Sequence, residues 1–428
     1  MKRFRIILCS LLLVLSLILI YGVSKQVFDN SETKNDETIN GIAMYVENDA
    51  GTYVSATELP GEGYIFNSGK SKCNNGAIPI WDSKTNSLIT SDLTTNGTSC
   101  YLYFDKTPCK SGDSACKKIL SNKLVKARKN LTDIISDETM GIVYSTKDND
   151  GTTLYFAGAP LDNYVKFAGQ YWRIIRINGD GSIRLLYAGN ATEIESDKYT
   201  ILSNGYADGS NHYLAIDNTA YKYNTCKEMY CLGYTYNVGS INGDEKDSAA
   251  KEQLEDWYSS NIATYESSID TNAGFCSDRS YEDGYDDSHV YYNYYGARLR
   301  LSDSKRPSLM CKDQDLFTVQ GATKGNGDLD APVGLITADE LNYAGSVWGG
   351  SNINTKVFTR SGFSYWTMSP FSSKGSEHYM TILHSAGYIT REKGLDRTDS
   401  FYLRPVINLK GSVTLTGDGT MSNPYVVG

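Results

Sequence analysis

Cysteine is the residue type in this chain with the most definite chemistry. Nine cysteines are present, and eight remain when Cys9, inside an N-terminal apolar run, is set aside. An even number of cysteines in a chain with an export-type N-terminus predicts a disulfide framework. Many full pairings are possible, and proximity along the chain favours Cys73–Cys100, Cys109–Cys116, Cys226–Cys231 and Cys276–Cys311.

Cys226 and Cys231 could also carry chemistry of their own. A thiolate with a lowered pKa is able to bind copper or to exchange disulfides. We predict a structural bridge at this pair and keep free, reactive thiols as the alternative.

Metal and catalytic motifs are weak. The four histidines are scattered (His212, His289, His378 and His384) and none has a ligand-type spacing to a cysteine. Acidic stretches at 282–287 and 328–330 could supply oxygens to calcium, but we favour solvated loops as their interpretation. No Gly-x-Ser-x-Gly, P-loop or His-Glu-x-x-His motif is present. We therefore predict no catalytic residue, no metal site and no cofactor, with calcium as the open alternative.

Aromatic loops are the best candidates for ligand contacts. The chain has 33 Tyr against 12 Phe and 5 Trp, and tyrosine is enriched at recognition surfaces. Tyr291, Tyr292 and Tyr294 crowd one segment, and Trp348 and Asn352 lie in a Gly-rich loop further on. The alternative is that these side chains close a loop-rich core.

Three signals near the C-terminus define the elements that position this loop. Thr337 and Glu340 form a capping box that starts a short helix, which Gly345 ends. Aromatic and β-branched residues predict strands at 365–370 and 401–409. We expect Trp366 to be buried in the first strand and Arg404 to be a structural cation in the second.

The succession of Gly334–Leu341, Tyr365–Pro370 and Arg404–Lys410 resembles an uncharacterised family of secreted or surface-anchored proteins of Gram-positive bacteria. That family is similar to the C-type-lectin-like superfold, which includes the formylglycine-generating enzymes and many surface binding domains. The resemblance spans about 157–427 and implies an α+β fold with many short strands and two helices, the longer at about 248–265. It also implies that the loop holding Trp348 and Asn352 is the ligand platform.

The same resemblance bears on the chemistry of the cysteines and of calcium. Formylglycine-generating enzymes carry two active-site cysteines at the spacing of Cys226 and Cys231, but near their closing strands. Here the pair precedes the long helix. The Glu-Pro-Asn and Trp-Asn-Asp triplets of calcium-dependent lectins are missing. Oxidase chemistry therefore stays an alternative to a structural bridge.

The rest of the chain divides by composition. Residues 1–23 hold a basic start and an apolar run that predict a signal-anchor, with a cleaved signal as the alternative. We expect a polar stalk at 24–40, a small β module at 41–106, a linking helix within 107–140 and the C-type-lectin-like domain at 141–428. The helix prediction rests on an apolar stripe over 114–136, with its basic residues on a solvated face.

A net charge of −9 argues against nucleic acid as a partner. The sequence thus predicts a membrane-tethered, extracellular recognition protein that binds a glycan or a surface protein without catalysis. An extracytoplasmic enzyme, either an oxidase or a cell-wall-modifying activity, and a structural envelope protein remain as alternatives.

Overall fold

The computed structural model describes residues 41–61, 63–77, 79–82, 87–89, 98–126, 128, 130–191, 215–216, 219–224, 232–237, 245–280, 293–374, 377–393 and 400–428. The fold is mostly β-sheet, with 39% strand and 15% helix. The predicted α+β, C-type-lectin-like class with an N-terminal membrane anchor is therefore wrong. The sequence predicts many short, irregular strands beside two helices, and in the structure the residues in strands outnumber those in helices.

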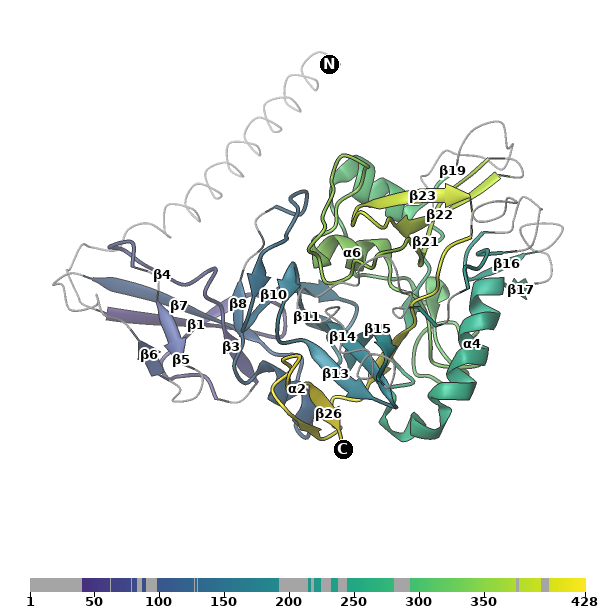
Figure 1. Cartoon of the computed structure of the whole chain (residues 1–428). Coiled ribbons are helices and arrows are strands. Elements are labelled where there is room, and N and C mark those ends of the chain that lie inside the picture. The colour runs from purple at the N-terminus through teal and green to yellow at the C-terminus, as the bar shows by residue number, and fades with distance from the viewer. Residues whose placement is uncertain are drawn as a thin grey trace, which may run out of the picture.

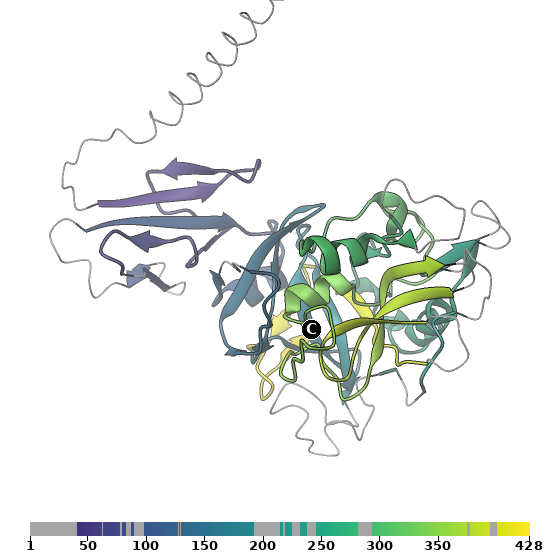
Figure 2. The ribbon, with the colours of Figure 1, turned by 90° about the horizontal axis from the view of Figure 1, so that it is seen from above.

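Near the start of the described chain, five strands form a small sheet in the order β2-β1-β7-β3, with β4 also paired to β7. These strands are β1 (Gly41–Glu47), β2 (Tyr53–Ala56), β3 (Tyr64–Phe66), β4 (Lys72–Cys73) and β7 (Ser99–Lys106). A short hairpin of β5 (Ile80–Asp82) and β6 (Ser87–Ile89) lies with them. Phe66, Trp81 and Phe104 form its aromatic core. Figures 1 and 2 show this sheet projecting from one side of the larger body.

A disulfide joins two adjacent strands of this sheet. Cys73 and Cys100 are direct cross-strand partners on β4 and β7, and they form a bridge, as predicted. The bridge restricts the unfolded state of a unit with a small core. We expect the double variant Cys73→Ala/Cys100→Ala to lose about 2–4 kcal/mol of stability in this sheet. Limited proteolysis and urea unfolding would measure it; unchanged protease resistance of residues 41–106 would contradict the prediction.

In the described part of the chain the largest sheet has nine strands, in the order β25-β26-β13-β14-β11-β10-β8, with β15 paired to both β14 and β24. The strands are β8 (Leu124–Lys126), β10 (Ile142–Asp148), β11 (Gly151–Tyr155), β13 (Tyr164–Phe167), β14 (Gln170–Ile177), β15 (Ile183–Asn190), β24 (Val406–Leu409), β25 (Leu415–Thr416) and β26 (Tyr425–Val427). Its central strands β14 and β15 are almost entirely buried. They are joined at Asn178–Gly181, which confirms the hairpin that Asn-Gly predicts there.

A second, four-stranded sheet has the order β19-β21-β22-β23. It contains β19 (Asn293–Tyr294), β21 (Tyr365–Lys374), β22 (Glu377–Leu383) and β23 (Ile389–Lys393). Trp366 on β21 is fully buried and donates its indole N–H to the Tyr221 carbonyl, 2.7 Å away, so the prediction of burial is confirmed. Shorter pairs are β9 (Glu138–Thr139) with β12 (Ala159–Pro160), β16 (Thr235–Asn237) with β17 (Glu245–Asp247), and β18 (Phe275–Cys276) with β20 (Leu316–Phe317).

The helices are short. In the described residues they are α2 (Ser114–Leu120), α4 (Ala249–Asn261), α5 (Gly296–Arg298) and α6 (Ala338–Ala344), with the 3-10 segments η2 (Ala263–Ser268) and η4 (Asp313–Asp315) and the π-helical segment η3 (Leu299–Ser304). The long helix predicted near 248–265 is α4, and its Trp257 ring meets Tyr187 of β15 at 5.4 Å. Helix α6 has the predicted capping box between Thr337 and Glu340 and ends at Gly345 with φ 116°.

The linking helix predicted within 107–140 is wrong beyond its first two turns. Helix α2 ends at Leu120, and Leu124–Lys126 becomes β8, parallel to β10. The apolar stripe omitted Val125, which is fully buried opposite Val143. Strand pairing at Val125 therefore determines the local structure, in place of the helix that the apolar periodicity predicts. Lys123, expected on a solvated face, is 4% exposed and forms an ion pair with the equally buried Asp162.

The predicted membrane anchor at 1–23 and stalk at 24–40 lie outside the described residues. From Gly41 onward, across the ranges that the structure describes, no helix has the length and apolar character needed to cross a bilayer. The structure therefore does not support the predicted single-pass membrane protein.

Candidate functional site

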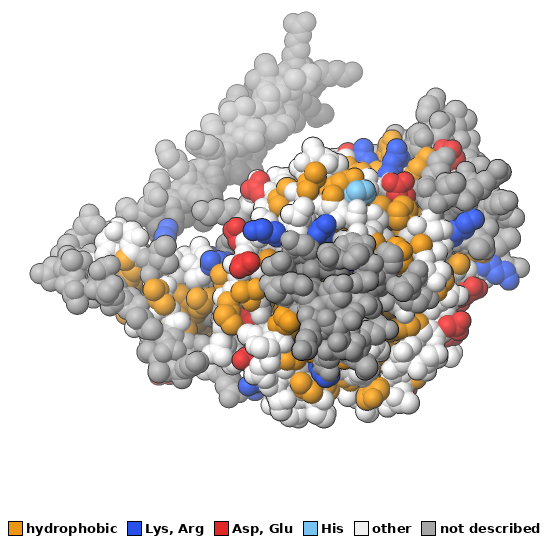
Figure 3. Space-filling view, in the orientation of Figure 1, with side chains coloured by type: hydrophobic (Ala, Val, Ile, Leu, Met, Phe, Trp, Pro, Cys, Tyr) orange, Lys and Arg blue, Asp and Glu red, His pale blue; other side chains and the backbone are white. Residues whose placement is uncertain are grey.

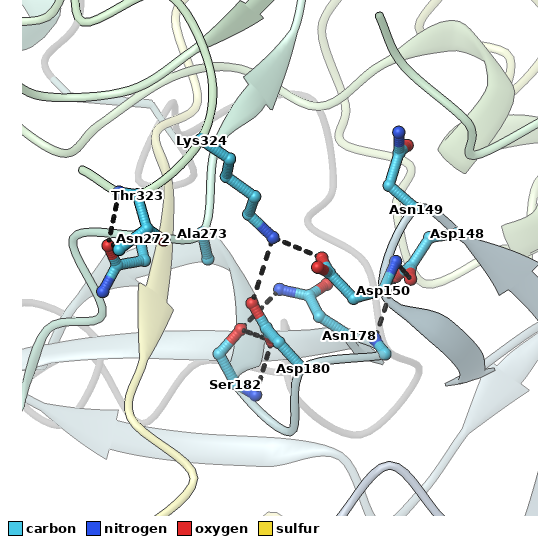
Figure 4. Close-up of polar contacts among 12 residues, drawn as sticks. Asp148, Asn149, Asp150, Asn178, Asp180, Ser182, Asn272, Ala273, Thr323 and Lys324 are labelled. Atoms are coloured by element: carbon cyan, nitrogen blue, oxygen red, sulfur yellow. Dashed lines mark hydrogen bonds and ion pairs between the residues drawn. The ribbon is translucent and has the colours of Figure 1, made fainter. Parts of the chain in front are cut away.

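Two hairpin turns of the large sheet bring acidic side chains together. Asp148 and Asp150 lie in the turn between β10 and β11, and Asp180 lies in the turn between β14 and β15. Figure 4 shows the Lys324 ammonium between the last two carboxylates. It forms an ion pair with Asp150 and lies 3.6 Å from Asp180 Oδ2. The lysine therefore supplies the positive charge that links these turns to the loop after β20.

The same cluster continues inward to the capped helix. Glu340, the third residue of α6, accepts a hydrogen bond from Arg176 Nε at 3.1 Å and forms an ion pair with Arg184 Nε at 2.5 Å. Its other oxygen accepts the backbone N–H of Thr337 at 2.9 Å. Both guanidiniums and the helix N-terminus favour the charged form, so the pKa of Glu340 lies below its ordinary value despite full burial.

A third arginine completes the network. Arg300 binds both oxygens of Asp339 at 2.8 and 2.7 Å and also forms an ion pair with Asp278. The Arg300 guanidinium helps to lower the pKa of Asp278, although burial opposes the effect. A general acid at neutral pH needs a raised carboxyl pKa. The space that these carboxylates and arginines line measures only about 50 Å³. We therefore interpret these carboxylates and arginines as a structural network of ion pairs.

The loop after α6 forms a different kind of site. Gly345 is left-handed, and a Cβ there would lie 2.7 Å from the Ile135 carbonyl oxygen, so the chain turns tightly against the 131–135 segment. Trp348 follows and stacks on the buried Phe371 ring, with centroids 4.8 Å apart and planes 11° from parallel. The Asn352 Nδ2 donates to the Trp348 carbonyl at 2.6 Å. The indole is thus half-buried and fixed in place.

We call the space beside this indole the Trp348 cavity. It measures about 130 Å³, room for several waters because one water needs roughly 10–15 Å³. Its lining comes from three distant segments: Leu131 and Thr132; Leu301, Lys305 and Pro307; and Asn342, Val347, Trp348 and Asn352. Arg128 holds the helix end that carries Asn342, donating to the carbonyls of Asn342 and Tyr343 at 2.7 and 2.9 Å.

Asn342 is the most informative residue of the lining. It is 4% exposed, and its Nδ2 donates to the Ser346 carbonyl at 3.2 Å, which fixes the orientation of the amide. Its Oδ1 is buried and accepts no hydrogen bond from any residue that the structure describes. A buried acceptor without a donor is costly. Asn342 lines the Trp348 cavity, while its Oδ1 atom is buried behind that lining.

The predicted ligand residues are only partly brought together. Trp348 and Asn352 line one cavity, as expected of a platform. Tyr294 is half-buried and meets the Phe371 ring edge-on at 6.4 Å. It therefore contacts the ring on which Trp348 stacks, but it is not part of the cavity lining. Tyr291 and Tyr292 lie outside the described residues, as do Cys226 and Cys231.

Three of the predicted disulfides are confirmed: Cys73–Cys100, Cys109–Cys116 and Cys276–Cys311. The last closes the charged network described above, since both of its cysteines line that space.

One group of carboxylates has metal-like spacing. Ligand oxygens of Asp247, Glu255 and Asp330 lie within 4.8 Å of one another. The Lys251 ammonium bonds Asp247 at 2.8 Å and Glu255 at 2.9 Å, and so supplies a positive charge to two of the three. Of the two acidic stretches considered for calcium, only Asp330 takes part, and 282–287 falls outside the described ranges.

Sequence reasoning missed Thr132, Lys305 and Asn342 as lining residues. The sequence indicates Asn342 only weakly, because a polar residue inside a short capped helix either faces solvent or makes a polar contact. The others belong to no motif, and only folding brings them to Trp348. Comparisons of the chain with protein-family models, with curated proteins and with solved structures find no match.

Proposed function

We propose that this protein binds a glycan, without catalysis, at the Trp348 cavity. The observation that carries the proposal is the half-buried Trp348 indole, held by its stack on Phe371, in a cavity that Asn352 also lines. Small-molecule sites combine aromatic walls with a few well-placed polar groups. A sugar ring has both an apolar face for the indole and hydroxyls for the amide, so it satisfies both features at once.

The surroundings support a recognition surface. Ile134 and Ile353 are 38% and 56% exposed, and they lie on the segments that flank the cavity, which Asn354 ties together by donating to the Ile135 and Gly345 carbonyls. On the face seen in Figure 3, acidic and basic side chains are interspersed, which suits neither nucleic acid nor an anionic lipid surface. The three disulfides are typical of proteins that fold in an oxidising compartment.

The test is a binding screen with the oxidised full chain against an array of glycans and cell-wall fragments, followed by calorimetry on the hits. We expect Trp348→Ala to weaken binding at least tenfold, because the stacking surface is lost. Trp348→Phe should retain part of the affinity. Tyr101→Ala, which removes an aromatic side chain 39% exposed on the small sheet, is the matched control and should bind normally.

Circular dichroism and melting curves must show that each variant is folded. Saturable binding that Trp348→Ala leaves unchanged would place the site elsewhere. A folded protein that binds nothing on the array would contradict glycan recognition. The resemblance to the Gram-positive surface family stays a prediction of the sequence.

A further inference from the structure

Among the described residues that line the Trp348 cavity, one is charged, and it is a cation. Lys305 is exposed and lines the cavity together with uncharged residues only. No ion pair involves Lys305 among the described residues, whereas Asp303 on the same turn is paired with Arg298. Asp133, next to Thr132, is outside the lining and accepts a hydrogen bond from Asn130 at 2.8 Å. The positive charge at the cavity is therefore uncompensated by these neighbours.

The backbone at Lys305 is unusual. The residue ends η3 with φ 57° and ψ 33°, and its N–H donates to the Arg300 carbonyl. Only one other non-glycine residue of the described chain, Ala168, has a positive φ. Glycine adopts this conformation more easily than any other residue. A lysine here places a long cationic side chain at the cavity at some backbone cost, a pattern associated with functional positions.

We propose that the glycan bound at the Trp348 cavity is acidic, and that Lys305 selects it by contacting a carboxylate or phosphate group. This inference rests on the proposed function. Trp348 packs against the sugar ring, and the Lys305 ammonium binds the anionic group. Since the whole chain carries a net charge of −9, affinity for an anion must arise locally, and Lys305 is positioned to provide it.

The test uses three matched probes on the oxidised full chain: a neutral glucan tetrasaccharide, its uronate counterpart with a carboxylate at C6, and the same glucan phosphorylated at C6. We expect at least one acidic probe to bind about fivefold more tightly than the neutral one at low salt, with the difference falling as salt is added. The two acidic probes distinguish a carboxylate from a phosphate as the recognised group.

The variants separate charge from backbone. Lys305→Gln and Lys305→Gly should both bring the affinity for the acidic probes down to that for the neutral probe. Lys305→Gly also suits the left-handed backbone, so it should fold at least as well as the natural chain. Lys305→Arg should keep the preference. Equal affinity for neutral and acidic probes, unchanged in Lys305→Gln, would overturn the inference and leave glycan binding standing. Failure of the folded chain to bind any of the three probes would overturn the inference, and the same failure on the whole glycan array would overturn the proposed function.

Discussion

Glu340→Ala is expected to destabilise the protein by about 3–5 kcal/mol, the largest effect that we anticipate for a single side chain. Glu340 is 2% exposed and balances two guanidiniums, of which Arg184 is 1% exposed and Arg176 is largely buried. Truncation leaves two cations in a low-dielectric interior without their shared anion. It also removes half of the capping box of α6.

Glu340→Gln distinguishes the two contributions. Glutamine retains an oxygen for the Thr337 N–H but carries no charge, so this variant should still lose most of the stability. Urea unfolding followed by tryptophan fluorescence would measure both variants, with Glu377→Gln as a control on β22. A Gln variant within about 1 kcal/mol of the natural chain would show that the ion pairs with Arg176 and Arg184 contribute little.

The lowered pKa of Glu340 adds a pH signature. A carboxylate whose pKa is lower in the folded than in the unfolded state contributes stability above its ordinary pKa of 4.5 and loses it as the pH falls through the folded value. The difference in unfolding free energy between the natural chain and Glu340→Gln should therefore be full at neutral pH and shrink in acid. A difference that grows in acid would contradict the assigned ion pairs.

Arg404→Ala is expected to cost a similar amount, about 3–5 kcal/mol, for a different reason. Arg404 is 1% exposed and, within the described chain, forms no ion pair with a carboxylate. Its guanidinium donates to the Tyr187 carbonyl from Nε at 3.2 Å and from Nη2 at 2.8 Å, and to the Thr359 carbonyl from Nη1 at 2.5 Å. It also lies over the Tyr365 ring at 4.9 Å.

This geometry confirms Arg404 as a buried structural cation and identifies its partners as carbonyls and a ring. It connects β15 to the segments on either side of β21, so truncation frees two buried carbonyls and opens a void. Arg404→Lys keeps the charge but cannot serve both carbonyls with a planar fork, and we expect it to lose most of the stability as well. Arg404→Met fills the space without the charge and should be less harmful than alanine.

Melting curves and urea unfolding of the three Arg404 variants provide the measurement. An unchanged curve for Arg404→Ala would contradict the structural role. A methionine variant less stable than alanine would contradict the expectation that filling the space offsets part of the loss.

Features that depend on neighbouring residues were predictable. The capping box at Thr337 and Glu340, the Asn178–Gly181 turn, helix α4 and the Cys109–Cys116 bridge follow from contacts within short stretches. The other two bridges close loops of 27 and 35 residues and were predicted only by pairing each cysteine with its neighbour in the sequence. Hydrogen bonds and loop closure over a few residues are encoded locally, so their signals are present in the sequence itself.

Features that depend on distant segments were not predictable. Val125 lies in a sheet because it pairs with β10, and Lys123 is buried because it forms an ion pair with Asp162. The balance of strand over helix follows from many such pairings. The sequence indicated Trp348 and Asn352 by residue type alone.

The tertiary structure decided what surrounds Trp348. It brought Lys305 and Thr132 to one cavity from positions about 40 and 215 residues before Trp348, whereas Asn342 is a near neighbour in the sequence. Burial of Asn342 Oδ1, the left-handed backbone of Lys305 and the stack on Phe371 are properties of that assembly. The sequence by itself determined the short elements and the side chains available for binding. Long-range packing determined which of those side chains share a site, because no local interaction encodes their meeting.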